Sequence, residues 1–201
     1  MTRQLALPIQ PPPEPTLDNF VPGSNAELLA RLHALAAGQR VDAVLYLWGA
    51  PGSGRSHLLK ASARDGVQVA DDVERLDDAG QIALFHAINR ARESGGTVLA
   101  AGAQPPARLP LREDLRSRLA WGLVYEVQPL TDDERSLYLL GEAARRGLRL
   151  SDDVAAYLLA HVRRDMASLG AILDHLDRTS LELHRPVTLP LVRAALRDLQ
   201  P

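Results

Sequence analysis

The sequence predicts an α/β domain with a parallel sheet, followed by a small all-helical domain. Short apolar runs alternate with helical patterns up to residue 130, and a glycine-rich loop joins the first run to a helix. After Pro129 the apolar period changes to 3.6 residues throughout. We expect a flexible tail at 1–15, the α/β domain at 16–130 and the helical domain at 131–201.

The composition limits the kinds of partner and chemistry. With 201 residues, 46% of them hydrophobic, the chain can bury a real core. The net charge is −2 and charges of both signs are interspersed, so we expect only indirect contact with DNA. The absence of cysteine excludes disulfides and thiolate catalysis, and the histidines show no metal-ligand spacing. No stretch approaches the ~20 apolar residues that a membrane span needs, and we expect a cytoplasmic protein.

The α/β domain follows a proline-rich spacer and alternates helices with strands. The expected elements are a helix that Ser24-Asn25 caps and Gly38 ends, a strand at 43–48, a helix that opens at Ser56, a strand at 67–70, a helix through 82–93, a strand at 98–101, a helix at 113–119 and a strand at 123–127.

The helical domain opens on a capping-box pattern, Thr131 to Glu134, and Ser151 begins a looser one. Four apolar stripes at helical spacing follow, and we expect each to face the core. The stripes are Leu137, Leu140 and Ala144; Val154, Leu158 and Val162; Met166, Leu169, Leu173 and Leu176; and Leu191, Ala194 and Leu196.

The run Gly-Ala-Pro-Gly-Ser-Gly-Arg-Ser at 49–56 predicts a phosphate-binding loop, because glycines let backbone N–H groups surround an anion before a helix N-terminus. Arg55 stands where lysine is usual. Its planar guanidinium can bind phosphate oxygens in a bidentate way, but it is less suited than a compact ammonium to following a phosphoryl group during transfer. The alternative is a glycine-rich turn that binds nothing. The candidate nucleotide ligands are Gly49, Gly52, Ser53, Gly54, Arg55, Ser56 and His57, with the Ser56 hydroxyl also a candidate magnesium ligand.

Asp71 and Asp72 end the strand at 67–70, where a carboxylate beside the loop can reach Mg²⁺. We expect Asp71 to be the magnesium partner and Asp72 the group nearest a hydrolytic water. The alternative is an acidic turn or helix cap. Two further basic residues could have structural roles only. Arg118 could be a solvated surface residue. Arg164 could form a surface ion pair with Asp165.

Taken in order, these motifs resemble the initiator clade of the AAA+ ATPases over nearly the full chain. Within it, they resemble most the regulatory inactivators of the replication initiator DnaA. The segments that carry the resemblance are Thr16 to Phe20 with Pro22-Gly23, the loop at 49–56, Asp71-Asp72, the segment 109–115, Ser117-Arg118-Leu119 before Trp121-Gly122, and Arg164 to Met166. The sequence shows no counterpart of the initiator's terminal domains, which favours the inactivators over the initiator itself.

The resemblance implies an AAA+ base domain, a helical lid, and ADP or ATP with Mg²⁺ as cofactors. Pro22 and Gly23 would lie near the base of the nucleotide, and Arg164 would be the phosphate sensor of the lid. Arg118 would be an arginine finger that acts in trans on ATP held by DnaA. The resemblance therefore implies a negative regulator of replication initiation.

The tail resembles a sliding-clamp-binding peptide, and the resemblance implies that Gln4, Leu5, Leu7 and Pro8 bind the clamp. A short apolar segment can enter a groove of the DNA polymerase III clamp, although a solvated tail is the alternative. We therefore expect DnaA and the clamp as partners and a location at the nucleoid or replisome. Whether the chain also forms a homo-oligomer stays open.

Two departures from the family pattern limit this inference. Few residues separate the loop helix from Asp71, so the sheet could be reduced to four strands. Ala103 occupies the first-sensor position, where Gln104 could substitute. From Arg55 and Ala103 together, we expect little or no ATP hydrolysis by the chain alone. Two other functions stay open: an autonomous AAA+ ATPase or loader, and a clamp-tethered adaptor with a vestigial nucleotide site.

Overall fold

The structure is a computed structural model, which describes residues 14–39, 41–162, 166–183 and 185–199. The described residues form two compact units. One comprises Glu14–Leu130 and contains the sheet, and the other begins at Thr131 and is helical.

The first unit contains a parallel sheet in the order β2-β3-β1-β4. The strands are β1 (Val44–Trp48), β2 (Val67–Ala70), β3 (Thr97–Gly102) and β4 (Leu123–Glu126). In this register Val44 pairs with Val98, and Leu45 pairs with Leu123. Only residues 63–66 separate helix α2 from β2, which leaves no room for a further strand and helix. The expected reduction to four strands is confirmed.

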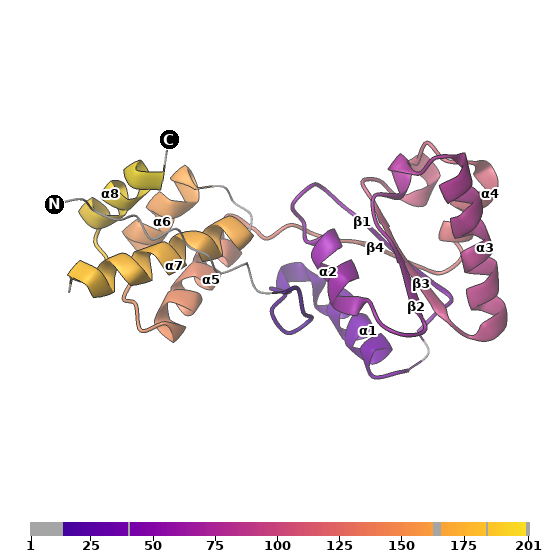
Figure 1. Ribbon diagram of the computed structural model, residues 1–201, viewed down its shortest axis with the longest axis horizontal. Coiled ribbons are helices and arrows are strands. Elements are labelled where there is room, and N and C mark those ends of the chain that lie inside the picture. The colour runs from indigo at the N-terminus through magenta and orange to yellow at the C-terminus, as the bar shows by residue number, and fades with distance from the viewer. Residues whose placement is uncertain (1–13, 40, 163–165, 184, 200–201) are drawn as a thin grey trace. The chain divides into compact units, whose positions relative to one another are not determined.

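Helices cover both faces of this sheet (Figure 1). The helices are α1 (Ala26–Ala36) and α2 (Arg55–Ser62) on one face, and α3 (Asp78–Ser94) and α4 (Glu113–Leu119) on the other. Side chains of β1 alternate between the faces: Leu45 and Leu47 pack with α1 and α2, whereas Val44 and Tyr46 pack with α3 and α4. Both faces of β1 are buried, as expected for a parallel sheet.

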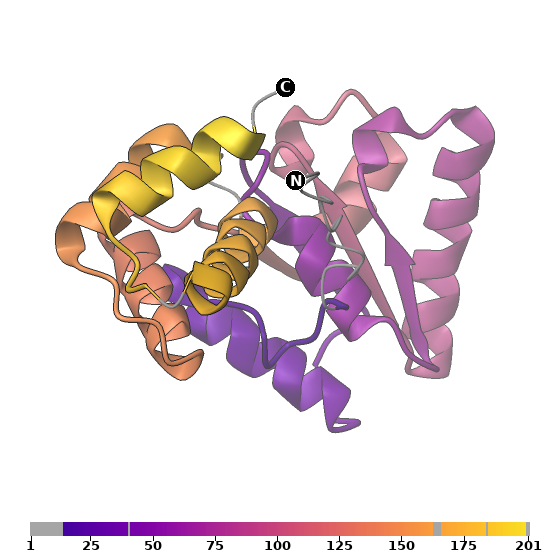
Figure 2. The same cartoon turned by 60° about the vertical axis from the view of Figure 1, so that its left-hand side comes forward.

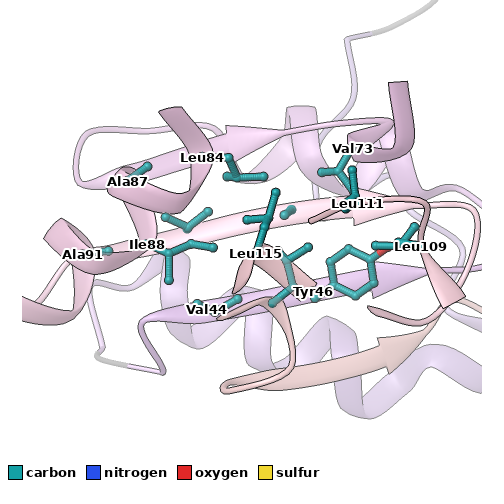
Figure 3. Close-up of a cluster of buried hydrophobic side chains, with 13 residues drawn as sticks. Val44, Tyr46, Val73, Leu84, Ala87, Ile88, Ala91, Leu109, Leu111 and Leu115 are labelled. Atoms are coloured by element: carbon teal, nitrogen blue, oxygen red, sulfur yellow. The ribbon is translucent and has the colours of Figure 1, made fainter. Parts of the chain in front are cut away.

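The core on the α3 and α4 face contains a polar group among aliphatic side chains (Figure 3). The Tyr46 ring extends from β1 toward Val73, Leu109 and Leu111 and is fully buried. Three short 3₁₀ helices join the main elements of this unit: η1 (Gly23–Asn25) precedes α1, η2 (Val73–Arg75) follows β2, and η3 (Pro106–Arg108) follows β3. Val73 anchors η2 in this core, which fixes the chain that follows β2.

The second unit comprises α5 (Asp132–Arg145), α6 (Asp152–His161), α7 (Met166–Leu183) and α8 (Leu189–Leu199). These helices, coloured orange to yellow, form a bundle around one aliphatic core (Figure 2). Thr131 and Glu134 form the expected capping box, because each side chain bonds the backbone N–H of the other residue. No helix in the described part of the chain is long and apolar enough to cross a membrane.

Several of the expected details are wrong. In α5 the buried positions are Leu139 and Ala143, whereas Leu137 is 70% exposed. In α8 Val192 and Ala195 are buried, rather than Ala194. Each helix has apolar residues on more than one face, so a periodic stripe does not identify the buried one.

The expected side-chain caps at two other helix starts are also absent. Ser151 precedes α6 and Asn25 precedes α1, but neither side chain caps its helix. The Asn25 side chain instead bonds Gln128: it accepts from the backbone N–H at 2.8 Å and donates to the carbonyl at 2.9 Å. This contact ties η1 to the chain that follows β4.

Candidate functional site

The carboxyl ends of β1, β2 and β3 lie at one edge of the sheet because the strands are parallel. The glycine-rich loop follows β1, Asp71 follows β2, and Ala103 follows β3. The structure therefore brings three of the sequence-predicted sites to the same edge.

The glycine-rich loop has the backbone geometry of an anion cradle. Gly52 and Gly54 have φ of +80° and +101°, a conformation that favours glycine. The loop turns through a hydrogen bond from Ser53 N–H to the Ala50 carbonyl at 3.1 Å, and α2 begins directly at Arg55. At Gly49 a side chain would meet the Val127 carbonyl at 2.6 Å and the Ser53 hydroxyl at 3.1 Å. Glycine is therefore required at Gly49, Gly52 and Gly54 for backbone reasons.

Two polar side-chain atoms of the loop lack hydrogen-bond partners in the described structure. These are the Ser53 hydroxyl and Nη1 of Arg55, and both atoms are buried. A buried donor without a partner is costly, so such atoms in a loop of this kind fit an anionic ligand. Ser56, one residue further along α2, is exposed and its hydroxyl is available.

The segment before α1 packs against the loop. The Phe20 ring lies against Gly54, where a side chain would come within 2.7 Å of Phe20 Cε2. His57 Nε2 lies 2.9 Å from the Thr16 carbonyl, and its ring lies 5.5 Å from that of Phe20. This fixes the chain leading to Pro22 and Gly23, and Gly23 adopts φ +48°. The predicted base-binding segment and the loop thus belong to one connected structure.

The two aspartates after β2 have different environments. Asp71 is exposed, and its Oδ1 accepts a hydrogen bond from the Asp72 N–H at 2.9 Å. Asp72 has φ +46° and its carboxylate lies 3.5 Å from Nη1 of Arg75. Asp71 can therefore offer an oxygen to a cation, whereas the Asp72 carboxylate already faces Arg75. The role of Asp71 as a magnesium ligand stays a prediction.

A polar cluster that the sequence did not indicate surrounds the end of β3. Glu74 Oε1 accepts a hydrogen bond from the Ala103 N–H at 3.2 Å, and the Tyr46 hydroxyl donates to the Gln104 carbonyl at 2.8 Å. Burial raises the pKa of Tyr46, the nearby Glu74 charge raises it further, and the Arg55 charge lowers it. The phenol is therefore protonated at neutral pH, and its hydrogen bond holds the segment that follows β3.

Arg118 lies in a cluster of its own on α3 and α4. Its Nε donates a hydrogen bond to Asn89 Oδ1 at 3.0 Å. Its guanidinium carbon lies 3.5 Å from the ring centroid of Trp121 and 5.1 Å from that of Phe85. Arg92 also approaches the Trp121 ring, at 4.8 Å. Two aromatic rings and one amide thus orient the predicted arginine finger.

This cluster lies at the amino edge of the sheet. Trp121 shares the lining of a surface cavity of about 710 Å³ with Asp42 and Val44, at the start of β1. A side chain at Gly122 would collide with the Val44 carbonyl. The strand β1 separates this edge from the glycine-rich loop by on the order of 13 Å. Arg118 is therefore remote from the chain's own loop.

Some predicted site residues lie outside the described residues. They are Gln4, Leu5, Leu7 and Pro8 of the tail, and Arg164 of the helical unit. No motif in the sequence indicated Asn89, Tyr46 or Glu74. The first could have been found, because Phe85 and Asn89 share a helix face at i, i+4, but nothing in the sequence places Tyr46 beside Glu74.

Few protein groups in the described structure could bind a metal ion. No group of three or more His, Asp or Glu side chains in the described ranges could hold a metal ion by itself. A hydroxyl from Ser56 and a carboxylate from Asp71 suit Mg²⁺ bound mainly through nucleotide phosphates and water.

Comparisons with known proteins agree with this architecture. Residues 132–196 match the family described as the Hda lid domain. Domain III of the Thermotoga maritima replication initiation protein DnaA has a TM-score of 0.70 at 21% identity, covering 94% of this chain and 98% of that one.

Two more distant structures have the same fold. AMPPCP-bound DnaA from Aquifex aeolicus gives 0.69 at 19% identity, covering 85% of this chain and 67% of that one. A variant of Thermotoga maritima RuvB gives 0.67 at 19% identity, with 93% and 72% covered. The expected AAA+ fold with a helical lid is confirmed. The chain therefore has the fold of these DnaA and RuvB structures, and its residues 132–196 match the Hda lid-domain family.

Proposed function

We propose that the chain is a DnaA-related regulator that binds ADP or ATP and promotes hydrolysis of ATP held by DnaA. Its Arg118 would enter the nucleotide site of DnaA and stabilise the charge that develops on the γ-phosphate. Conversion of ATP-DnaA to the ADP form would make the chain a negative regulator of replication initiation.

The position of Arg118 is the observation that supports this proposal most strongly. Asn89 and Trp121 hold it at the amino edge of the sheet, whereas the chain's own loop lies at the carboxyl edge. A guanidinium in this position can serve a nucleotide on another molecule. Arginine fingers supplied in trans contribute ~10³ to 10⁵ in rate in other nucleotide hydrolases.

The chain's own nucleotide site is assigned to the carboxyl edge. Backbone N–H groups from Gly52 to Ser56, with the Arg55 guanidinium, would hold phosphates. Ser56 and Asp71 would hold Mg²⁺, which neutralises phosphate charge when bound. The remaining ligands follow the family pattern: Gly49, Ser53 and His57 in the loop, Pro22 and Gly23 near the base, and Arg164 in the lid. The AMPPCP bound by the DnaA relative supports an adenine nucleotide.

Weak hydrolysis by the chain alone fits the groups near its loop. The Asp72 carboxylate, the candidate water-orienting group, faces Arg75 at 3.5 Å. Ala103 offers no polar side chain, and its N–H already bonds Glu74. The enzymatic activity would therefore belong to DnaA, with this chain as its activator.

The tail residues Gln4, Leu5, Leu7 and Pro8 would bind the sliding clamp on DNA. Such a tether raises the local concentration of two partners without any new contact between them. DNA would then be approached only through the clamp and DnaA.

The proposal is tested by measuring ATP turnover by the chain alone, by DnaA alone, and by both together with DNA-loaded clamp. We expect negligible turnover by the chain, slow turnover by DnaA, and fast conversion in the mixture only when the clamp is present. Sustained turnover by the chain alone would instead favour the autonomous ATPase or loader. A stimulating chain that binds no nucleotide would favour the adaptor with a vestigial site.

A further inference from the structure

The strand β2 forms an open edge of the sheet. It stands first in the order β2-β3-β1-β4, so β3 is its one strand partner among the described residues. The short connection at 63–66 provides no strand or helix to cover its outer side. Gln68 and Val69 are both exposed, and Val69 keeps 42% of its surface accessible. This edge therefore presents both backbone and apolar side-chain surface to solvent.

The backbone groups of β2 alternate between β3 and the outer side. The Thr97 N–H donates to the Gly66 carbonyl at 3.2 Å, so that carbonyl faces β3. Because successive peptide groups of a strand point in opposite directions, the N–H and C=O of Val67 and Val69 face outward. The Val67 N–H donates to the Arg64 carbonyl at 3.1 Å, which agrees with this direction. Val69 has no such backbone partner in the described ranges.

The outward-facing groups form a row that is symmetric about Val69. The row consists of the Val67 carbonyl, the Val69 N–H, the Val69 carbonyl and the Asp71 N–H. An antiparallel copy of the same segment satisfies every one of these groups. Each Val69 N–H would donate to the Val69 carbonyl of the other copy, and each Asp71 N–H would donate to the Val67 carbonyl of the other copy. The edge is therefore complementary to itself.

The side chains of the segment also suit a second copy. In this pairing the two Val69 side chains lie opposite each other on one face, so each covers exposed apolar surface of the other. Asp71 would lie opposite Val67, so no like charges face each other in the paired segment. Edge strands are commonly protected by a charge or a proline, and Val67–Ala70 contains neither. At the other edge of the sheet, β4 carries Glu126.

We propose that two copies of this chain pair through β2, antiparallel and with two-fold symmetry about Val69, so that their sheets become continuous. This inference depends neither on the proposed nucleotide site nor on DnaA. Arg118 lies on α4, which packs against β1, and β3 separates β1 from the paired edge. The pairing therefore leaves Arg118 accessible in both copies. Because the paired segment is short, the dimer is reversible and forms at high protein concentration.

Single-cysteine variants test the register directly, because the chain contains no cysteine. Residues opposite each other in a hydrogen-bonded antiparallel pair have Cα atoms about 5.5 Å apart, which is within disulfide range. We expect Val69→Cys to form a disulfide-linked dimer under mild oxidation. In Gln68→Cys the two cysteines would be diagonal neighbours, about 7–8 Å apart, and should crosslink about tenfold more slowly or not at all. Val124→Cys, on the other edge strand, is the second control.

Sedimentation over a concentration series measures the dimer without crosslinking. We expect a monomer–dimer equilibrium for wild type. Val69→Lys should raise the dissociation constant about tenfold or more, because two like charges would then lie opposite each other. Val124→Lys is the matched control, since Val124 is also an exposed valine on an edge strand, and it should dimerise like wild type. Thermal unfolding checks that each variant is folded.

Several results would overturn the inference. One is a wild-type chain that stays monomeric at millimolar concentration, with no crosslinking of Val69→Cys. A folded Val69→Lys variant that dimerises like wild type would show that another surface is used, and faster crosslinking of Gln68→Cys than of Val69→Cys would exclude the two-fold at Val69. A monomer whose Val69 amide is protected from hydrogen exchange would show that another segment, such as residues 1–13, occupies the edge.

Discussion

The side chains of Arg118 and Asn89 are joined by a hydrogen bond from Nε to the amide oxygen at 3.0 Å, which links α4 to α3. No other hydrogen bond of the Arg118 side chain is found among the described residues, so its two terminal nitrogens are available. Those nitrogens form the edge of the guanidinium that binds phosphate in a fork. The hydrogen bond to Asn89 therefore orients the Arg118 side chain through Nε and leaves its two terminal nitrogens available to bind phosphate.

The Asn89→Ala variant should therefore weaken stimulation of DnaA without affecting nucleotide binding by the chain. Loss of a hydrogen bond to a charged group should lower the stimulated hydrolysis rate about tenfold. The measurement is single-turnover hydrolysis, with ADP binding as the second readout. Arg90→Ala, an exposed change on the same helix, is the control and should behave like wild type. Full stimulation by Asn89→Ala would show that the hydrogen bond does not position Arg118.

The Gly54→Ala variant should be less stable than Gly52→Ala, although both positions have positive φ. Each substitution forces an L-residue into the left-handed region, at about 1–2 kcal/mol. Only at Gly54 does the new side chain also meet Phe20. Urea unfolding measures the difference, and Phe20→Leu combined with Gly54→Ala should recover part of the loss. Equal free energies of unfolding for the two alanine variants would contradict the observed contact.

The N-cap residues of α5 and α6, Thr131 and Ser151, provide a matched pair of alanine variants. Thr131→Ala removes a side-chain cap and should cost about 1 kcal/mol. Ser151→Ala, at a start without such a hydrogen bond, should change the free energy of unfolding by less than half as much. Hydrogen exchange of amides in α5 and α6 reports each helix separately. A larger effect at Ser151 than at Thr131 would show that the caps are assigned to the wrong helix.

The sequence predicted much of the base domain because its signals are local. The loop at 49–56 has a glycine wherever the backbone requires one, and the short connection before β2 indicated the four-stranded sheet. The buried residues of the helical unit were harder to predict, because α5 has leucines on several faces. Only packing against the neighbouring helices selects Leu139 rather than Leu137 for burial.

The parts of the site that depend on distant contacts were not predictable. Arg118 could be singled out by its motif, but its partners Asn89 and Phe85 come from a different helix. Glu74 has no motif that marks it, and its hydrogen bond to the Ala103 N–H follows from the position of η2 beside the end of β3. Tertiary contacts of this kind appear only when the elements are placed in space.

The central claim is that Arg118 acts on ATP held by DnaA. The most direct test is single-turnover conversion of labelled ATP preloaded on DnaA, with DNA-loaded clamp, comparing wild type, Arg118→Ala and Arg112→Ala. Arg112 is an exposed arginine that precedes α4 and pairs with Asp114, so its variant controls for loss of positive charge. We expect wild type and Arg112→Ala to stimulate hydrolysis, and Arg118→Ala to lose at least 100-fold of the stimulated rate while still binding ADP. Undiminished stimulation by Arg118→Ala would contradict the account.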